Sequence, residues 1–284
     1  MTGRYPSPRA LLDKYELRAK KSWGQNFLGD EGILDDIARL AAPGAADAVV
    51  ELGAGLGHLT ARLLARGARV VAVERDRDMA RVLRGELGGR ITLLEADAAR
   101  VDYGEIRRLI APSTPTAVPK LAVVGNLPYH LTSPILFSLL DQLEHVSRAV
   151  FLLQREVAER LAARPGSHDW GLASVFLQRE ADVSVERIVP PGAFVPPPNV
   201  ESAVLCALFR EPTDAVAVPE RFRRLVKAGF AQRRKTLRNA LEAARIAPPE
   251  RLAEALAQAG VDPGRRGETL TVAEWAAIDR ALGS

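Results

Sequence analysis

The apolar segment 48–52 runs directly into a glycine-rich turn at residues 53–57, and this combination constrains the fold more than any other feature. Glycine stands at positions 53, 55 and 57. Glycine lets a backbone turn sharply and approach a ligand closely. In an open α/β sheet, the ligand crevice lies at the edge where a strand ends in such a turn before a helix. The turn therefore marks a candidate binding site, although a purely structural turn is the simpler alternative.

Apolar patterns typical of strands and of helices alternate along the first half of the chain. We predict strands at residues 48–52, 69–73, 91–94, 121–124 and 149–153. We predict helices at residues 8–17, 31–42, 59–65, 79–87 and 135–143. Strands that alternate with helices form a parallel sheet that is covered on both faces.

The pattern changes in the second half of the chain. Segments 172–177, 183–189 and 202–209 are predicted to be closing strands, at least partly antiparallel, and 211–219 to be a linker. Helices are predicted at residues 221–230, 235–244, 249–259 and 272–282. The fold class is therefore α/β: a Rossmann-like sheet with helices on both faces, in a domain of residues 1–211, followed by a small all-helical domain of residues 212–284.

Composition and charge exclude several classes of protein. No run reaches the ~18 apolar residues of a membrane span, and the N-terminus lacks the apolar region of a signal peptide. The single cysteine, Cys206, excludes an internal disulfide and fits a reducing cytoplasm, where it is expected to be a small core residue. The four histidines are scattered, so no metal site is predicted.

Two acids follow the next two predicted strands. Glu74 directly follows the segment 69–73, about 20 residues after the glycine turn. This is the spacing of an acid that accepts hydrogen bonds from ribose hydroxyls. Asp97 follows the segment 91–94 and can accept a hydrogen bond from an adenine amine. A surface acid and a helix cap are the alternatives. His58 occupies the position of the third glycine of the dinucleotide fingerprint, so that fingerprint fails.

The tetrapeptide at residues 126–129 follows the fourth predicted strand. An adenine amine is a poor nucleophile because its lone pair is delocalised into the ring. Carbonyl acceptors on its hydrogens favour the pyramidal form with a free lone pair, and the Asn126 side chain and the Leu127 main chain can supply them. Tyr129 can stack on a flipped-out base. A turn that ends a strand is the alternative.

Phe194 opens a segment with three consecutive prolines, residues 194–202. Prolines stiffen a loop, so Phe194 can cover the other face of the base. A core position for Phe194 is the alternative.

The positive charge lies in the C-terminal quarter of the chain. The formal net charge is +4, whereas residues 220–284 hold 13 basic and 8 acidic side chains. Eight basic residues lie between positions 221 and 238 without an intervening acid: Arg221, Arg223, Arg224, Lys227, Arg233, Arg234, Lys235 and Arg238. Such a run fits phosphate contacts with RNA, with a solvated helix face as the alternative.

Four motifs resemble those of the rRNA adenine N6,N6-dimethyltransferase family, and most of all its bacterial small-subunit (16S) branch. They are residues 24–28 (GQNFL), 51–57 (ELGAGLG), 126–129 (NLPY) and 194–202 (FVPPPNVES), with a further match at 232–239. The resemblance implies a class I methyltransferase sheet with S-adenosylmethionine as cofactor. It implies cofactor contacts at Asn26, Leu28, Gly53, Gly55, Glu74, Asp97 and Asn126.

The resemblance also implies what the chain acts on. The expected substrate is a pair of adjacent adenosines in a hairpin near the 3′ end of 16S rRNA, within an immature ribosomal particle, and the expected enzyme is a cytoplasmic monomer that takes part in ribosome biogenesis. Arg233, Arg234, Lys235 and Arg238 are expected to bind RNA. Two alternatives stay open: a large-subunit (23S) rRNA methyltransferase of the macrolide-resistance type, and a non-catalytic RNA-binding assembly factor.

Overall fold

The computed structural model describes residues 5–20, 23–44, 47–110, 119–128, 131–211, 219–232 and 234–283. The chain forms two compact units. The α/β unit consists of Met1–Ala158 and Ser184–Phe209, and the helical unit consists of Glu159–Val183 and Arg210–Ser284.

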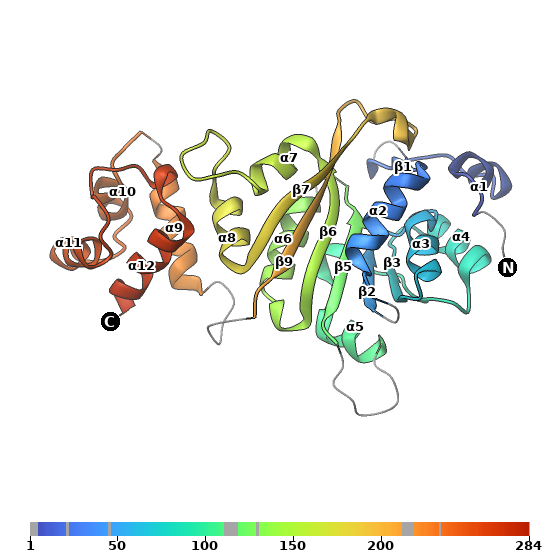
Figure 1. Ribbon diagram of the computed structural model, residues 1–284, viewed down its shortest axis with the longest axis horizontal. Helices are drawn as coiled ribbons and strands as arrows, with labels where there is room; N and C mark the ends of the chain where they lie inside the picture. Colours follow the sequence, from blue (N-terminus) through green and yellow to red (C-terminus); the bar gives the residue numbers. More distant parts are fainter. Residues whose placement is uncertain are drawn as a thin grey trace. The chain divides into compact units, whose positions relative to one another are not determined.

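A seven-stranded sheet with the order β4-β3-β2-β5-β6-β9-β7 forms the core (Figure 1). Its strands are β2 (Ala48–Leu52), β3 (Arg69–Val73), β4 (Thr92–Leu94), β5 (Leu121–Asn126), β6 (Val146–Gln154), β7 (Ala181–Val189) and β9 (Ser202–Phe209). The neighbours from β4 to β6 are parallel, and β9 runs antiparallel to β6. Every residue of β2 is buried, as expected of a central strand that is covered on both faces.

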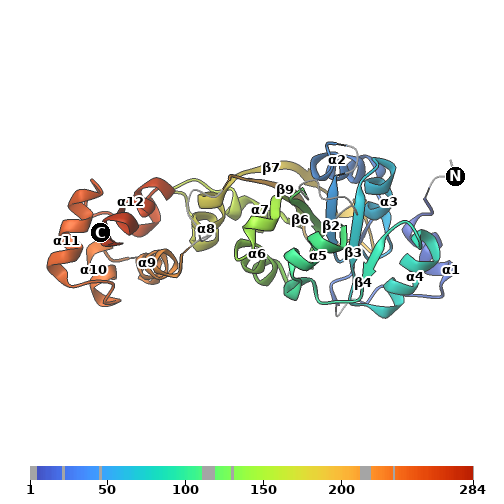
Figure 2. The same cartoon turned by 90° about the horizontal axis from the view of Figure 1, so that it is seen from below.

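Helices cover both faces of this sheet (Figure 2). The helices in this part of the chain are α1 (Pro8–Lys14), α2 (Glu31–Ala41), α3 (His58–Ala65), α4 (Arg77–Leu87), α5 (Tyr103–Ile110), α6 (Thr132–Leu140) and α7 (Arg155–Leu161). Helix α1 packs against α4 through Leu11, in one buried cluster with Met79 and Val82. The apolar sides of α2 and α3 pack in one buried cluster with Val49, Val70 and Val124 of the sheet. Helices α5 and α6 lie on the opposite side of the sheet.

The helical unit is built from α8 (Leu172–Glu180) and the C-terminal helices. These are α9 (Glu220–Ala231), α10 (Leu237–Ala243), α11 (Pro249–Gln258) and α12 (Val272–Gly283). Short 3-10 helices are η2 (Ala98–Arg100), η4 (Leu143–His145), η5 (Pro191–Ala193) and η6 (Gly267–Thr269). The rings of Phe176 in α8 and Phe222 in α9 lie 6.3 Å apart between centroids, and the indole nitrogen of Trp170 donates to the Leu270 carbonyl at 3.1 Å.

The predicted fold class is confirmed, but one predicted strand is wrong, and helices α5 and α7 were not predicted. Residues 172–177, predicted as a strand, belong to helix α8. Four consecutive residues from Ser174 to Leu177 are buried, so the segment shows no helical periodicity in its apolar pattern. Residues 159–183, which we expected in the first domain, form one unit with the C-terminal helices. The predicted linker lies mostly outside the described residues.

Candidate cofactor and adenine site

The glycine turn leaves β2 at the edge of the sheet where β3 and β5 also end. Gly53 and Gly55 have φ angles of 71° and 55°, a region that favours glycine. The Gly53 N–H donates to the Val73 carbonyl at 2.8 Å, which fixes the turn against β3. A Cβ at Gly53 would meet no atom within 4 Å, so only backbone bounds the cavity there.

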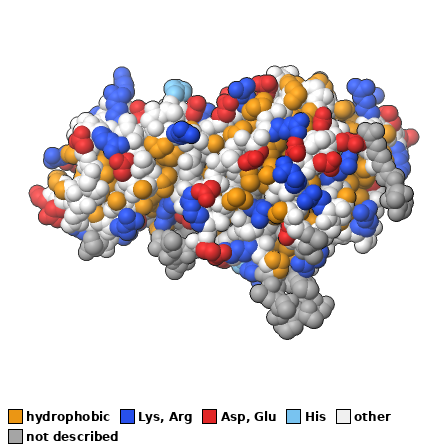
Figure 3. Space-filling model, viewed as in Figure 1, with side chains coloured by type: hydrophobic (Ala, Val, Ile, Leu, Met, Phe, Trp, Pro, Cys, Tyr) orange, Lys and Arg blue, Asp and Glu red, His pale blue; other side chains and the backbone are white. Residues whose placement is uncertain are grey.

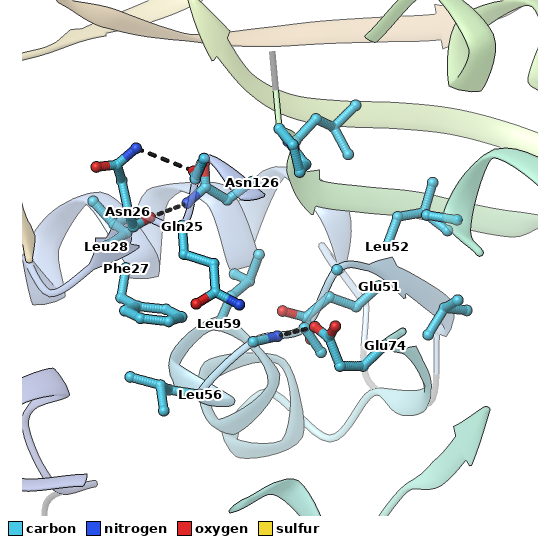
Figure 4. Close-up of a pocket in the computed structure, with 18 of the residues that line it drawn as sticks. Gln25, Asn26, Phe27, Leu28, Glu51, Leu52, Leu56, Leu59, Glu74 and Asn126 are labelled. Atoms are coloured by element: carbon cyan, nitrogen blue, oxygen red, sulfur yellow. Dashed lines mark hydrogen bonds between the residues drawn. The ribbon is translucent and has the colours of Figure 1, made fainter. Parts of the chain in front are cut away.

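Glu74 lies directly after β3 and its carboxylate points towards this turn (Figure 4). One carboxylate oxygen accepts the Gly55 N–H at 2.8 Å, and the other accepts the Asp76 N–H at 2.7 Å. The residue is 9% exposed, and burial raises the pKa of its carboxyl group. Each carboxylate oxygen can accept a second hydrogen bond, so the side chain retains acceptor capacity for a ribose.

Glu51 is a site residue that the sequence reasoning did not identify. It lies in β2, is 2% exposed and accepts a hydrogen bond from the Thr60 hydroxyl at 2.5 Å. Burial raises the pKa of its carboxyl group to about 8, and the negative charge of nearby Glu74 contributes. The available signal was an acid within an otherwise apolar buried strand, since such an acid requires a partner or a function.

Asp97 caps a short helix and also lines the pocket. Its side chain accepts the Ala99 N–H at 3.0 Å and so caps η2. It also lines the same pocket as Glu74, and its second oxygen lies 3.7 Å from the Arg75 guanidinium.

Asn126 ends β5, and one hydrogen bond fixes the orientation of its side chain. The amide nitrogen donates to the main-chain oxygen of Asn26 at 2.9 Å (Figure 4). Because a carbonyl can only accept, the nitrogen is assigned to this contact and the amide oxygen points the other way. Leu127 follows as a buried residue, with its N–H bonded to the Leu152 carbonyl at 3.1 Å.

A two-stranded sheet brings the N-terminal motif to the same pocket. Strand β1 (Phe27–Leu28) pairs antiparallel with β8 (Phe194–Val195), and Leu28 faces Phe194 across the pair. Both are 5% exposed or less and belong to the buried core, and both line the pocket. Phe194 thus occupies the core position that was its alternative reading and also bounds the cavity.

One pocket contains most of the predicted site. Its lining includes Asn26, Leu28, Gly53, Gly55, Glu74, Asp97, Asn126, Leu127 and Phe194. All of these residues belong to the α/β unit. The pocket combines acidic acceptors with one oriented amide oxygen, which suits a nucleoside ligand. Tyr129 lies outside the described residues.

Three of the four predicted RNA-binding residues are described. Arg234 and Lys235 are exposed between α9 and α10. Arg238 is exposed as well and forms a 2.7 Å ion pair with Glu242. Basic and acidic side chains are interspersed on the face of the molecule in Figure 3. Arg233 lies outside the described residues.

No group of three His, Cys, Asp or Glu side chains among the described residues is arranged to hold a metal ion. No helix within them is long and apolar enough to cross a membrane.

Comparison with known proteins identifies the family. The profile described as "Ribosomal RNA adenine dimethylase" matches residues 16–282. The chain belongs to the ribosomal RNA adenine dimethylase family. This confirms the predicted membership in a family of RNA methyltransferases.

Relatives in this family cover the whole chain. "Ribosomal RNA small subunit methyltransferase A" of Anaeromyxobacter sp. (strain K) is 79% identical over 284 residues, which is 100% of both chains. The protein of the same name from Myxococcus xanthus (strain DK1622) is 52% identical over 98% of this chain and 95% of its own.

Solved structures agree with the fold. The 23S rRNA methyltransferase ErmE is 28% identical with a TM-score of 0.68, over 91% of this chain and 100% of its own. A dimethyladenosine transferase from Plasmodium falciparum has a TM-score of 0.70 at 22% identity, over 89% of this chain and 95% of its own. The second similarity concerns the fold alone, which is that of a class I methyltransferase.

Proposed function

We propose that the protein transfers methyl groups from S-adenosylmethionine to the N6 amines of two adjacent adenosines in a hairpin near the 3′ end of 16S rRNA. The single observation that carries this proposal is the oriented amide of Asn126 at the pocket that also contains Glu74 and Asp97. The small-subunit relatives favour 16S rRNA over 23S rRNA. The proposed substrate is an immature small ribosomal particle in the cytoplasm, and the protein is proposed to act as a monomer.

The residues of the pocket fit this cofactor. Gly53 leaves room for a ligand against the backbone of the turn, whereas Gly55 allows the Phe27 ring to pack closely on it. Glu74 is proposed to accept ribose hydroxyls and Asp97 to accept an adenine amine, and Asn26 and Leu28 line the same pocket. The acids also suit a ligand with a net positive charge. When bound, S-adenosylmethionine supplies a methyl group that its sulfonium activates for transfer.

Asn126 and Leu127 act on the acceptor base. Because the Asn126 amide nitrogen is held by Asn26, its oxygen can accept a hydrogen from the adenine amine. The Leu127 carbonyl is proposed to accept the second hydrogen. Together they would hold the amine in a pyramidal form whose lone pair is free to accept a methyl group. Phe194, and Tyr129 by its place in the sequence motif, are proposed to enclose the flipped-out base.

Methyl transfer to purified ribosomal subunits tests the proposal. Small subunits that lack dimethyladenosine, separate large subunits, and S-adenosylmethionine with a labelled methyl group are incubated with the wild type. We expect label in dimethyladenosine of the small-subunit RNA only. Label in the large subunit would identify the 23S activity instead, and RNA binding without any transfer would identify an assembly factor.

Substitution of Asn126 tests the mechanism. With saturating cofactor, Asn126→Ala should lower the single-turnover rate by roughly 10²–10³ while RNA affinity is retained, because one preorganised acceptor is lost. The matched control is Asn239→Ala, since Asn239 is exposed in α10 and does not line the pocket. A near-normal rate in Asn126→Ala would mean that Asn126 only holds Asn26.

A further inference from the structure

Trp23 is a half-exposed aromatic residue at the edge of the cofactor pocket. Its side chain belongs to a residue that is 37% exposed, and it lines the same cavity as Glu74 and Asp97. The other two tryptophans, Trp170 and Trp275, are fully buried in the helical unit. Trp23 is therefore the indole of this chain that a ligand in the pocket can reach.

A guanidinium group packs on this indole. The central carbon of the Arg75 guanidinium lies 4.7 Å from the centroid of the Trp23 ring, and the Lys20 ammonium lies 5.3 Å from it. Cations at such distances from an indole are attracted to its ring. Arg75 immediately follows Glu74 in the chain and also approaches Asp97 at 3.7 Å. The indole and the guanidinium thus form one continuous wall between Trp23 and Asp97.

Asp76 holds the chain on both sides of Trp23. Its carboxylate accepts from the Lys20 ammonium at 2.8 and 2.9 Å and from the Gln25 side-chain amide at 2.8 Å. Asp76 is 2% exposed, so these contacts are shielded from water. The Asp76 N–H in turn donates to Glu74 at 2.7 Å. The position of the indole is therefore coupled to the acid that is proposed to bind the ribose.

The charged side chains around Trp23 and Arg75 determine which kind of ligand can bind there. Two cations, Lys20 and Arg75, are surrounded by the carboxylates of Glu74, Asp76, Asp78 and Asp97. Because these four carboxylates outnumber the two cations among the described residues, this edge favours a neutral or cationic flat ligand over a phosphate group of RNA.

We propose that Trp23 and Arg75 form the outer wall of the adenosine subsite and pack directly against the adenosine of the cofactor. This inference rests on the proposed function, because it assumes that S-adenosylmethionine occupies the pocket. Trp23 contacts the ligand, whereas Lys20, Gln25 and Asp76 position it.

Binding calorimetry with S-adenosylmethionine and S-adenosylhomocysteine tests this wall. We expect Trp23→Ala to weaken both ligands about tenfold, which corresponds to about 1.4 kcal/mol. The factor should be the same for both, since they share the adenosine and differ at the sulfur. Trp23→Phe should retain most of the affinity because it keeps an aromatic face. Leu109→Ala is the control, since Leu109 is 55% exposed and does not line the pocket.

Tryptophan emission gives a second readout that does not depend on turnover. In the wild type, either ligand should shield one indole from the neutral quencher acrylamide, and Trp23→Phe should abolish this protection. Unchanged affinity for both ligands in folded Trp23→Ala, or ligand protection that persists in Trp23→Phe, would overturn the proposal. Loss of RNA affinity alone in Trp23→Ala would overturn it as well. Absence of cofactor binding in the wild type would instead refute the proposed function.

Discussion

At the scale of single residues, the carboxyl group of Glu51 has a pKa far above its ordinary value. Its carboxyl group is fully buried in β2, and its pKa is raised from 4.5 to about 8, first by burial and then by the neighbouring charge of Glu74. The group is therefore largely protonated at neutral pH in the protein without cofactor. It carries a negative charge at neutral pH in the unfolded chain.

This difference predicts a pH dependence of stability. Between about pH 4.5 and pH 8 the folded protein binds more protons at Glu51 than the unfolded chain does. The stabilisation of the folded protein by proton binding at Glu51 is complete below pH 4.5 and is lost as the pH rises through 8. In this window the free energy of unfolding falls by up to about 1.4 kcal/mol per pH unit. Glu51→Gln removes the titrating group while keeping a polar partner for Thr60. Thermal unfolding between pH 5 and pH 8 should show that the wild type loses stability more steeply with rising pH than Glu51→Gln does. Parallel curves for the two proteins would contradict the assignment.

At the scale of secondary-structure elements, helix α8 shows how the helical unit is assembled. Its Phe176 packs against Phe222 of α9, and both rings are at most 1% exposed. Phe176→Ala should destabilise this unit by roughly 3–5 kcal/mol because it leaves a cavity. Hydrogen exchange should then increase in α9 but not in β2 or β5. Met79→Ala is the matched control and should give the opposite pattern, because Met79 is a buried residue of α4 in the α/β unit. Faster exchange in the central strands of Phe176→Ala would show that α8 supports the α/β unit instead.

The elements that could be predicted from the sequence are those with an unambiguous period. Strand β3 and strand β9 were predicted at their observed bounds, because each is a short apolar run between turn signals. The apolar run in α8 is buried on several sides, and in such a run strand and helix give the same pattern. Strands β1 and β8 have two residues each, which is too few for any period, and only their pairing defines them.

The candidate site was predictable to the same degree. Glu74, Asp97 and Asn126 could be placed because each follows a strand, and the carboxyl ends of parallel strands meet at one edge. Trp23 and Asp76 could not, because their roles depend on contacts between loops that no sequence period encodes. Similarly, no spacing in the sequence indicates that Asn126 would bond to the backbone of Asn26.

At the scale of the whole molecule, the basic residues before α10 and the residues of the cofactor pocket belong to different units. Arg234 and Lys235 are exposed in the helical unit, whereas the pocket is lined by the α/β unit alone. Their combined substitution by alanine should weaken RNA binding and lower the salt slope by up to about one per lost phosphate contact. Affinity for S-adenosylmethionine should not change. RNA titrations at several salt concentrations provide the measurement.

The control for this prediction removes the same charge elsewhere. Arg9 and Arg280 are exposed in α1 and α12, so Arg9→Ala combined with Arg280→Ala matches the change in net charge. If both double variants lose affinity equally, the effect comes from the overall charge and not from the surface before α10. Equal affinity and equal slope in the wild type and the Arg234/Lys235 variant would exclude phosphate contacts there.

The pairing of β1 with β8 has a consequence for how the protein folds during its synthesis on the ribosome. Residue 28 is synthesised early and its partner, residue 194, late. The wall of the pocket that they form can therefore fold only after most of the chain has left the ribosome. Contacts between such distant residues form slowly because a long loop must close first. A nascent chain that stops before residue 195 has the glycine turn but lacks the strand that completes the wall. Once that strand has formed, a ligand that binds only the closed pocket will stabilise the finished fold by mass action.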